Sequence, residues 1–348
     1  MKFTAAVLTH TGRPLEVIEN VEVPKLRPGQ LLVRIFYAGV CHSQLMEVSG
    51  ARGEDKYLPH MLGHEATAEV VDIGADVSKF RQGDKVVLGW IKSSGAEAGG
   101  SVYQSPIGDI NAGPVTTFSE LSVVSENRCY KLPHNIGLRE GVLLGCALPT
   151  GMGMVNNQIH CRAENSIGVL GLGGIGMAAL VAAISAKARL IVAIDSNPEK
   201  LTLAKKIGAH LCINVTKQNA YERIAEFTGG EMLDYIVEAA GQCQTIEQAF
   251  SLINKTKGKC VFASHPPLGK KIRLDPFELI CGKKIEGSWG GASNPDQLVK
   301  EVAYLPNTQI LTTLTSNNYQ LSDINKAMDD LQGQRVVRAI IDMDNSRQ

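Results

Sequence analysis

The segment from Ser166 to Ala186, SIGVLGLGGIGMAALVAAISA, constrains the fold of this chain more than any other. Its 21 residues carry no charge, a length that would also suit a membrane span. Five glycines among its first eleven residues argue against a membrane helix, because glycine favours turns and weakens helices. We therefore expect a buried strand at 166–171, a tight turn, and a helix that packs on the same sheet.

The glycines of this turn have the spacing Gly171-x-Gly173-x-x-Gly176, which between a strand and a helix is typical of a dinucleotide-binding site. The first glycine permits the turn, the second allows a pyrophosphate to approach the backbone, and the third allows close packing of helix and strand. Free N–H groups at the start of the helix attract the phosphates.

Asp195 ends the next apolar run, RLIVAID, 19 residues after Gly176. A carboxylate at this point can accept hydrogen bonds from a ribose diol and repels a 2′-phosphate, so the sequence favours NAD over NADP. The alternative is that Asp195 only caps the helix that begins near Pro198, a role in which Asn197 could replace it.

Strand and helix patterns alternate through the rest of this region and predict a doubly wound parallel sheet, an α/β architecture. Six strands are expected, at 166–171, 189–195, 210–215, 233–240, 259–264 and 283–289. Helices are expected between them, including those at 198–207, 217–228 and 244–253.

The first 150 residues have a different pattern, in which short alternating runs are broken by proline and glycine. This pattern predicts a β-rich domain, with strands at 31–40, 66–74 and 84–90. Residues 91–116 are rich in glycine and serine, lack regular periodicity, and are expected to form an exposed lobe or long loop. The final strand pattern, at 336–343, is expected to return to this first domain.

Length and composition agree with two domains and a small-molecule partner. A chain of 348 residues exceeds the usual size of one hydrophobic core. Basic and acidic residues number 35 each, without a run of like charges, so neither a nucleic-acid-binding surface nor a membrane-binding patch is indicated. The N-terminus lacks the apolar core of a signal peptide and the eight cysteines are scattered, which together predict reduced thiols and a cytoplasmic protein.

Three residues form a candidate metal site. Cys41 and His64 lie near the two ends of CHSQLMEVSGARGEDKYLPHMLGHE, and Cys146 precedes the cofactor-binding half. Two thiolates and one imidazole are a nitrogen–sulfur set that selects zinc, and three protein ligands leave a fourth position for water or substrate. Taken singly, each residue has another explanation, because cysteine is often buried without a ligand and His64 could be a hydrogen-bonded core histidine.

Together these motifs resemble those of the medium-chain, zinc-dependent alcohol dehydrogenase family, over nearly the whole chain. The matching motifs are Cys41-His42-Ser43, Gly63-His64-Glu65, Gly145-Cys146-Ala147-Leu148-Pro149-Thr150-Gly151, Gly171-Leu172-Gly173-Gly174-Ile175-Gly176 and Asp195. The resemblance implies a GroES-like catalytic domain of residues 1–147 and 290–348, and a Rossmann NAD-binding domain of residues 148–289. It also implies hydride transfer between a primary or secondary alcohol and NAD, in a homo-oligomer with two or four subunits.

The resemblance assigns roles to single residues as well. It implies that Cys41, His64 and Cys146 bind one catalytic zinc ion, that Ser43 takes the proton of the alcohol, and that Glu65 lies close behind the metal and takes part in catalysis. The residues that it implies as cofactor contacts are His42, Thr150, Gly171, Gly173, Gly174, Gly176, Asp195, Lys200 and Arg338. It implies Trp90 as a wall of the substrate pocket.

The chain also departs from the family pattern. Gln44 stands where an acidic residue usually follows the Cys-His-Ser triplet, and the lobe at 91–116 has no cysteine, so it cannot bind the second, structural zinc of many members. Polyol dehydrogenases commonly have glutamate in place of Cys146, which favours an alcohol dehydrogenase. The departures still leave open a polyol, sugar or cyclitol dehydrogenase of a biosynthetic pathway, and, from a different class, a non-catalytic NAD-binding protein.

Overall fold

The chain forms two compact units. The computed structural model describes residues 1–263, 266–303, 309–315 and 317–343. Unit 1 contains residues 1–146 and 294–348, and unit 2 contains residues 147–293. The first junction lies one residue before the predicted one, and the second lies four residues after it.

Unit 1 is built from β-sheets, as its short alternating runs predict. Five strands close into a barrel in the order β1-β2-β7-β8-β4. A second sheet has the order β10-β6-β5-β3-β18-β17, with β9 also paired to β3. The strands are β1 (Lys2–Leu8), β2 (Glu16–Glu22), β3 (Gln30–Val40), β4 (His60–Met61), β5 (Ala66–Ile73), β6 (Lys85–Leu88), β7 (Ser101–Ser105), β8 (Gly108–Ala112), β9 (Leu121–Ser125), β10 (Cys129–Lys131), β17 (Asn317–Gln320) and β18 (Ala339–Asp342).

Strand β3 is the centre of the larger sheet, because it pairs with β5, β9 and β18. Its sequence, QLLVRIFYAGV, is almost continuously apolar, and most of its residues are buried. A strand that is covered on both faces needs apolar side chains at nearly every position. Because β3 is held by three neighbouring strands, the position of the next residue, Cys41, is well defined.

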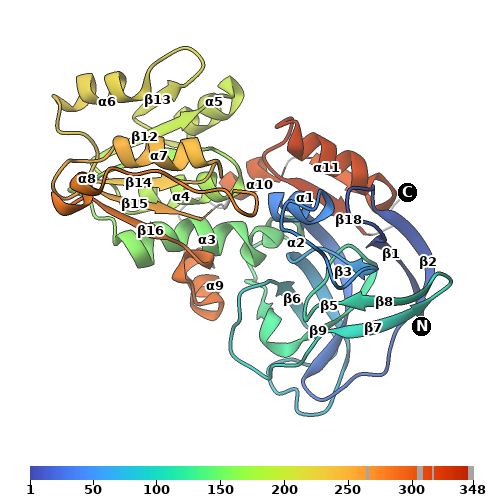
Figure 1. Ribbon diagram of the computed structural model, residues 1–348. Coiled ribbons are helices and arrows are strands. Elements are labelled where there is room, and N and C mark those ends of the chain that lie inside the picture. Colours follow the sequence, from blue (N-terminus) through green and yellow to red (C-terminus); the bar gives the residue numbers. More distant parts are fainter. Residues whose placement is uncertain (264–265, 304–308, 316, 344–348) are drawn as a thin grey trace. The chain divides into compact units, whose positions relative to one another are not determined.

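The C-terminal segment returns to unit 1, as predicted. Strand β18 pairs antiparallel with β3, so that Ala339 lies opposite Val40 and Asp342 opposite Tyr37. Figure 1 shows helix α11 (Ile324–Gln332) and β18 beside the N-terminal strands. The pairing brings Arg338, the residue before β18, close to the end of β3.

The segment at 91–116 contains more regular structure than its composition predicts. Strands β7 and β8 pair as an antiparallel hairpin within it. Tyr103 and Ile110 are fully buried, whereas Val102 is half exposed. Two runs of five residues are too short for a clear periodicity in the sequence, which explains why the hairpin was not predicted.

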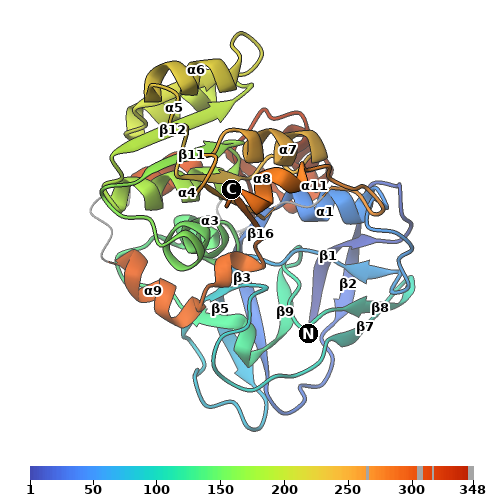
Figure 2. The same ribbon diagram turned by 60° about the vertical axis from the view of Figure 1, so that its left-hand side comes forward.

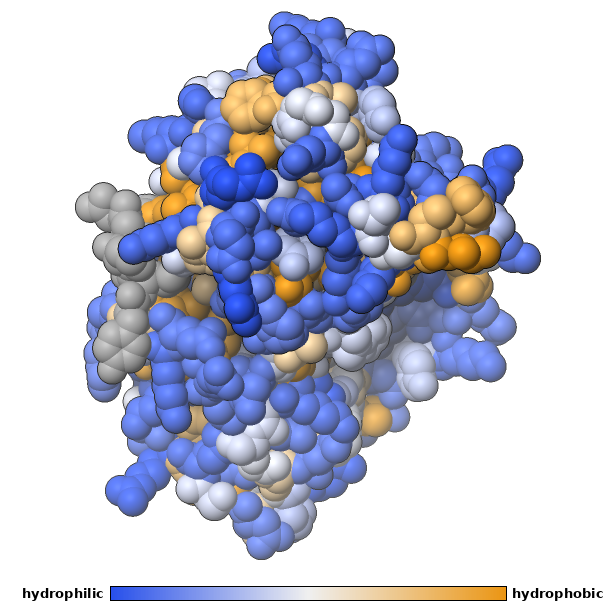
Figure 3. Space-filling view, turned by 90° about the vertical axis from the view of Figure 1, so that its left-hand side faces the viewer, coloured by the Kyte–Doolittle hydropathy of each residue, from blue (hydrophilic) through white to orange (hydrophobic). Residues whose placement is uncertain are grey.

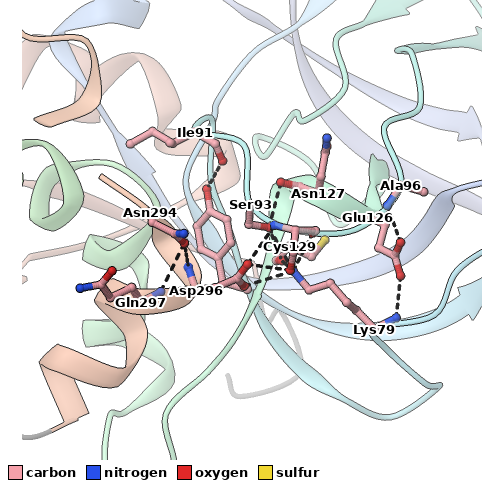
Figure 4. A network of polar contacts seen from close by, with 12 residues as sticks. Lys79, Ile91, Ser93, Ala96, Glu126, Asn127, Cys129, Asn294, Asp296 and Gln297 are labelled. Carbon is pink, nitrogen blue, oxygen red and sulfur yellow. Dashed lines mark hydrogen bonds and ion pairs between the residues drawn. The ribbon is translucent and has the colours of Figure 1, made fainter. Parts of the chain in front are cut away.

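Carboxylates anchor the first part of this segment (Figure 4). Glu126 accepts hydrogen bonds from the backbone N–H groups of Lys79 and Ala96, both at 2.6 Å. Asp296 accepts hydrogen bonds from the N–H and hydroxyl groups of Ser94, and from the Lys79 ammonium group at 3.2 Å. Charged side chains thus fix a segment that has no cysteine for a structural metal.

Unit 2 contains the predicted sheet of six parallel strands, in the order β13-β12-β11-β14-β15-β16. The strands are β11 (Ser166–Leu170), β12 (Leu190–Asp195), β13 (Leu211–Asn214), β14 (Tyr235–Glu238), β15 (Lys259–Phe262) and β16 (Lys284–Gly287). The strand order reverses at β11, which pairs with both β12 and β14. Ligands of such sheets bind beyond the carboxyl ends of the strands at the reversal, which is where the glycine turn lies.

Helices connect these strands. Those of unit 2 are α3 (Ala147–Gly153), α4 (Gly174–Ser185), α5 (Pro198–Ile207), α6 (Ala220–Thr228), α7 (Cys243–Ser251) and α8 (Pro276–Ile280). Helix α4 is buried from Gly176 to Ala183, because it packs both on the sheet and along α3 (Figures 1 and 2). Helix α5 begins at Pro198 and ends before Gly208, as predicted.

The helices of unit 1 are α1 (His42–Val48), α2 (Leu138–Gly141), α9 (Pro295–Ala303), α10 (Gln309–Leu314) and α11. Within the described ranges, no helix is both long enough and apolar enough to cross a membrane. Helix α4, in the charge-free segment, has only 12 residues. On the face drawn in Figure 3, hydrophilic side chains predominate and apolar ones gather in small patches. The charge-free segment is a strand, a turn and a buried helix.

Candidate metal centre and cofactor turn

Three segments of unit 1 bring Cys41, His64 and Cys146 together. Cys41 precedes α1, His64 lies between β4 and β5, and Cys146 follows a turn of 3₁₀-helix at Val142–Gly145. One possible ligand atom from each of the three residues lies within 4.8 Å of the others. Both cysteines are buried. Two sulfur atoms and one ring nitrogen thus converge in the interior of unit 1.

The two ring nitrogens of His64 have different surroundings. Its Nδ1 atom contacts Gln44, whereas its Nε2 atom is buried and makes no hydrogen bond to any described residue. A buried polar atom without a partner costs about 1–3 kcal/mol. With two sulfur atoms nearby, the free nitrogen completes a donor set that fits zinc.

The two thiols of this cluster differ in proton affinity. Contact with the Cys146 thiol lowers the pKa of Cys41, and Arg338 and His64 lower it further although burial opposes them. Contact with Cys41 and burial both raise the pKa of Cys146. The metal-binding form of each is the thiolate, so a metal ion would have to displace the proton that Cys146 holds.

A buried ion pair between Glu65 and Arg338 accompanies the cluster. The two residues are 0% and 3% exposed. Burial raises the pKa of Glu65, and Arg338 opposes this shift. Burial alone would lower the pKa of Arg338, but Glu65, Cys41 and Cys146 raise it. The positive charge of the guanidinium group therefore balances the negative charges of the Glu65 carboxylate and of the cysteine thiolates. The family resemblance predicts that the same group faces the cofactor.

The Glu65 side chain fits beside the cluster because Gly39 and Gly145 have no side chains there. A Cβ atom at Gly39 would lie 2.1 Å from Glu65 Oε1. A Cβ atom at Gly145 would lie 2.7 Å from Glu65 Cβ and 2.2 Å from the backbone oxygen of Leu88. Any larger residue at either position would displace the glutamate from its place beside the cluster.

Two side chains of α1 complete the surroundings of the cluster. Ser43 Oγ is buried and makes no hydrogen bond to a described residue. Gln44 Oε1 accepts a hydrogen bond from the backbone N–H of Cys41 at 2.9 Å, and its Nε2 atom lies 2.5 Å from His64 Nδ1. From the family pattern, support of His64 by Gln44 is expected to be weaker than that of an acidic residue or to come from the amide oxygen. The structure places the amide nitrogen at His64 and the oxygen at the Cys41 N–H.

In unit 2, glycine is required at different positions of the turn after β11 for different physical reasons. Gly171 has a φ of +89°, and a Cβ atom at Gly176 would lie 1.8 Å from the backbone oxygen of Gly171. Gly173 has an ordinary φ of −76°, and no atom lies within 4 Å of where its Cβ would be. Neither conformation nor packing requires glycine at Gly173, so the open approach to its backbone fits a ligand phosphate.

Asp195 lies against this turn. Its Oδ2 atom accepts a hydrogen bond from the backbone N–H of Leu172 at 2.6 Å. The helix cap is Asn197, whose side chain accepts from the backbone N–H groups of Glu199 and Lys200. Burial lowers the pKa of Lys200, and Asp195 opposes this shift. The carboxylate thus lies at the turn without serving as the helix cap.

The remaining predicted residues occur in both units. In unit 1, His42 is exposed at the start of α1 and Trp90 is half-buried after β6. In unit 2, Thr150 is buried in α3 and Gly174 begins α4. Their contacts with cofactor and substrate stay predictions from the family match.

Two family models match the chain. A model described as "Alcohol dehydrogenase GroES-like domain" matches residues 27–134, and one described as "Zinc-binding dehydrogenase" matches residues 174–304. The S-(hydroxymethyl)glutathione dehydrogenases of Synechocystis sp. and of Photobacterium damsela subsp. piscicida are each 31% identical to this chain, over 98% of it and 100% of their own length. The chain belongs to the medium-chain, zinc-dependent alcohol dehydrogenase family.

Solved structures agree with this assignment of the dehydrogenase. An alcohol dehydrogenase zinc-binding domain protein from Burkholderia ambifaria matches with a TM-score of 0.90 and 26% identity, over 99% of both chains. Benzyl alcohol dehydrogenase from Acinetobacter calcoaceticus shares the fold, with a TM-score of 0.87 and 24% identity over 99% of both chains. The dehydrogenase uses zinc and NAD, and transfers hydride between NAD and a primary or secondary alcohol or the corresponding carbonyl compound.

Sequence reasoning missed one buried group of the dehydrogenase near the glycine turn. Glu238 ends β14, is 0% exposed, and accepts hydrogen bonds through Oε1 from the N–H groups of Ala240 and Gly241 and the hydroxyl of Thr245. A Cβ atom at Gly171 would lie 2.6 Å from the Ala240 nitrogen, so Glu238 shapes the backbone that packs on the turn. The sequence signal that could have identified Glu238 is its position as an acidic residue at the end of the apolar strand β14.

Proposed function

We propose that Cys41, His64 and Cys146 hold the catalytic zinc of this alcohol dehydrogenase. The observation that carries the proposal is the convergence of three ligand atoms within 4.8 Å, together with a His64 Nε2 atom that makes no hydrogen bond among the described residues. Three protein ligands leave a fourth position for the substrate oxygen, as a catalytic zinc site requires.

The neighbouring side chains have distinct tasks in this proposal. Bound zinc supplies Lewis acidity, which lowers the pKa of an alcohol. Ser43 takes the alcohol proton, because a hydroxyl can accept one hydrogen bond while it donates another. Arg338 balances the charge of Glu65 and the thiolates, which lowers the free energy of burying them. The chain holds the reactants at a fixed distance and excludes water, while the hydride chemistry belongs to NAD.

The proposed NAD site follows the glycine turn of unit 2. The open backbone at Gly173 supports a pyrophosphate there, and the contact between Asp195 and Leu172 supports a ribose beside it. Further proposed cofactor contacts, which rest on the family match, are His42, Thr150, Lys200 and Arg338. Trp90 is proposed to line the substrate pocket on the same ground.

Metal analysis of matched variants tests the ligand set. We expect about one zinc ion per chain in the wild-type protein, and its removal by a chelator should abolish NAD reduction until zinc is restored. His64→Ala and Cys146→Ala should each lose the metal and at least about 99.9% of the activity. Cys260→Ala removes a buried cysteine of unit 2 and should retain both. Zinc that persists in both ligand variants would exclude this set.

An activity screen tests the substrate class. The panel contains primary, secondary, aromatic and sugar alcohols with NAD, and S-(hydroxymethyl)glutathione because the relatives carry that name. We expect the highest kcat/KM for a simple primary or secondary alcohol. A clear preference for a sugar or cyclitol hydroxyl would contradict this expectation.

The dehydrogenase is further proposed to form a homo-oligomer. Strand β16 is the edge of the parallel sheet, and Phe277 and Ile280 of the preceding helix α8 are 65% and 80% exposed. An edge strand beside exposed apolar side chains favours pairing with a second copy. Light scattering should give two or four times the chain mass of 37.4 kDa, and the monomer mass would contradict the proposal.

A cytoplasmic location is proposed as well. All eight cysteines lack a disulfide partner, as is usual for proteins of a reducing compartment. Cell fractionation with an antibody against the native protein tests the location directly, and recovery in a secreted or periplasmic fraction would exclude it.

A further inference from the structure

An irregular segment follows β6 and carries Trp90, the residue proposed to line the substrate pocket. It runs beside the turn of 3₁₀-helix that precedes β10. The Gly89 N–H donates to the Arg128 carbonyl oxygen at 2.9 Å. Further along, the Ser93 N–H donates to the Asn127 carbonyl oxygen at 2.8 Å. Trp90 therefore lies on a stretch of backbone that is held on both sides.

Two side chains hold the backbone between these points. The Arg128 guanidinium group donates to the Trp90 carbonyl oxygen. The Tyr130 hydroxyl donates to the Ile91 carbonyl oxygen at 2.5 Å, and Figure 4 shows this carbonyl at the end of the bond. Tyr130 is 0% exposed, and burial raises the pKa of its phenol, so the hydroxyl keeps its proton and remains a donor. Two successive carbonyls thus accept hydrogen bonds from side chains.

Gly89 makes room for the tyrosine ring. Tyr130 lies opposite Val87 where β10 pairs with β6, and its ring extends from there towards the segment that follows β6. A Cβ atom at Gly89 would lie 2.3 Å from the Tyr130 hydroxyl oxygen and 2.6 Å from its Cε2 atom. A larger residue would displace the ring, so the glycine before Trp90 allows the phenol to reach the Ile91 carbonyl.

We propose that Arg128 and Tyr130 are positioning residues for the substrate pocket, which fix the Trp90 backbone and thereby limit the size of the alcohol that the pocket admits. The inference rests on the proposed role of Trp90 as a wall of that pocket. Groups that line a binding site must be held within about 0.5 Å of their productive positions, and supporting hydrogen bonds do this. Both residues act through the Trp90 backbone, without touching the substrate.

Substrate discrimination tests the inference, measured as the kcat/KM for benzyl alcohol divided by that for ethanol. Trp90→Ala removes the wall and should raise this ratio about tenfold or more. Tyr130→Phe removes only the hydroxyl and leaves the Ile91 carbonyl unpaired, so the wall can yield and the ratio should rise about 3–10-fold. Arg128→Met, at a less buried residue, provides a second variant with the same expected direction. All three should keep the zinc content of the wild-type protein.

Tryptophan fluorescence provides a readout that does not depend on turnover. The chain has two tryptophans, so Trp289→Phe leaves Trp90 as the single emitter. In this background, Tyr130→Phe should move the emission to longer wavelength and lower its anisotropy, because a released indole meets more water and moves more freely. Tyr103→Phe is the matched control, since Tyr103 is also 0% exposed in unit 1 and its hydroxyl accepts from the Val123 N–H at 2.7 Å. It should change neither the emission nor the ratio.

The outcomes separate this inference from the pocket assignment on which it rests. Wild-type ratio and emission in Tyr130→Phe and Arg128→Met, with a raised ratio in Trp90→Ala, would overturn the positioning role alone. Equal changes in Tyr103→Phe would also overturn it, because the loss of any buried hydroxyl would then suffice. So would a loss of zinc in Tyr130→Phe, since the effect would then act through the metal. An unchanged ratio in Trp90→Ala would overturn both Trp90 as a wall and this inference.

Discussion

Asp195 has two functions that a single substitution can separate. Its carboxylate accepts from the backbone N–H groups of Leu172 and Asn197, and its charge is proposed to repel a 2′-phosphate. Asp195→Asn keeps an acceptor oxygen but removes the charge. We expect the preference for NAD over NADP, measured as the ratio of kcat/KM values, to fall about tenfold or more. Asp234→Asn is the control, since Asp234 accepts from the Ser166 N–H at the other end of β11.

Glu238 predicts a specific pH dependence of stability. Burial raises the pKa of this carboxyl, so its contribution to stability is present in acid and is lost as the pH rises through its folded pKa. Glu238→Gln keeps the Oε1 acceptor and cannot ionise. Relative to wild type, the variant should therefore gain in Tm as the pH rises from about 4.5 to 8. Parallel Tm curves for the two proteins would show that Glu238 is not charged in this range.

The anchored segment of unit 1 predicts the opposite dependence. The N–H groups of Ala96, Lys79 and Ser78 outweigh burial and lower the pKa of Glu126. Its contribution is therefore present above the ordinary value of 4.5 and is lost as the pH falls through the folded pKa. Glu126→Gln should lower the free energy of unfolding in urea at pH 7 by about 1–3 kcal/mol. Glu97→Gln, at an exposed residue of the same segment, should change it little.

Elements with strong local signals could be predicted from the sequence. Strands β11 and β12 of unit 2 are fully buried runs, almost entirely apolar, and the bounds of α5 follow from Asn197 and Gly208. Helix α6 begins three residues later than expected, because Asn219 accepts from the first N–H groups. The three candidate metal ligands could be named from their residue types, and the family resemblance added that they bind one catalytic zinc ion. The ion pair between Arg338 and Glu65 was not predicted, because it depends on the segments before β18 and β5, which lie far apart in the chain.

The whole molecule consists of one unit formed by a single segment of the chain and one unit formed by two separate segments. Unit 2 is one continuous segment, whereas unit 1 needs both ends of the chain. A chain that ends at Gly333 lacks β18 and Arg338 and leaves Glu65 as an uncompensated buried charge, a loss of about 3–5 kcal/mol. We expect this truncated chain to lose its zinc, while limited proteolysis still releases a resistant fragment near 147–293. Equal digestion of both units would contradict this expectation.

The return of β18 to β3 also sets an order of events during synthesis. The ribosome releases Cys41, His64 and Cys146 well before Arg338, which follows Cys146 by 192 residues. The nascent chain therefore carries the sulfurs and Glu65 without their counter-ion until all of unit 2 has been made and Arg338 follows it. Maturation of the metal centre is thus coupled to the synthesis of unit 2, and a chain that terminates within unit 2 would lack the cation that pairs with Glu65.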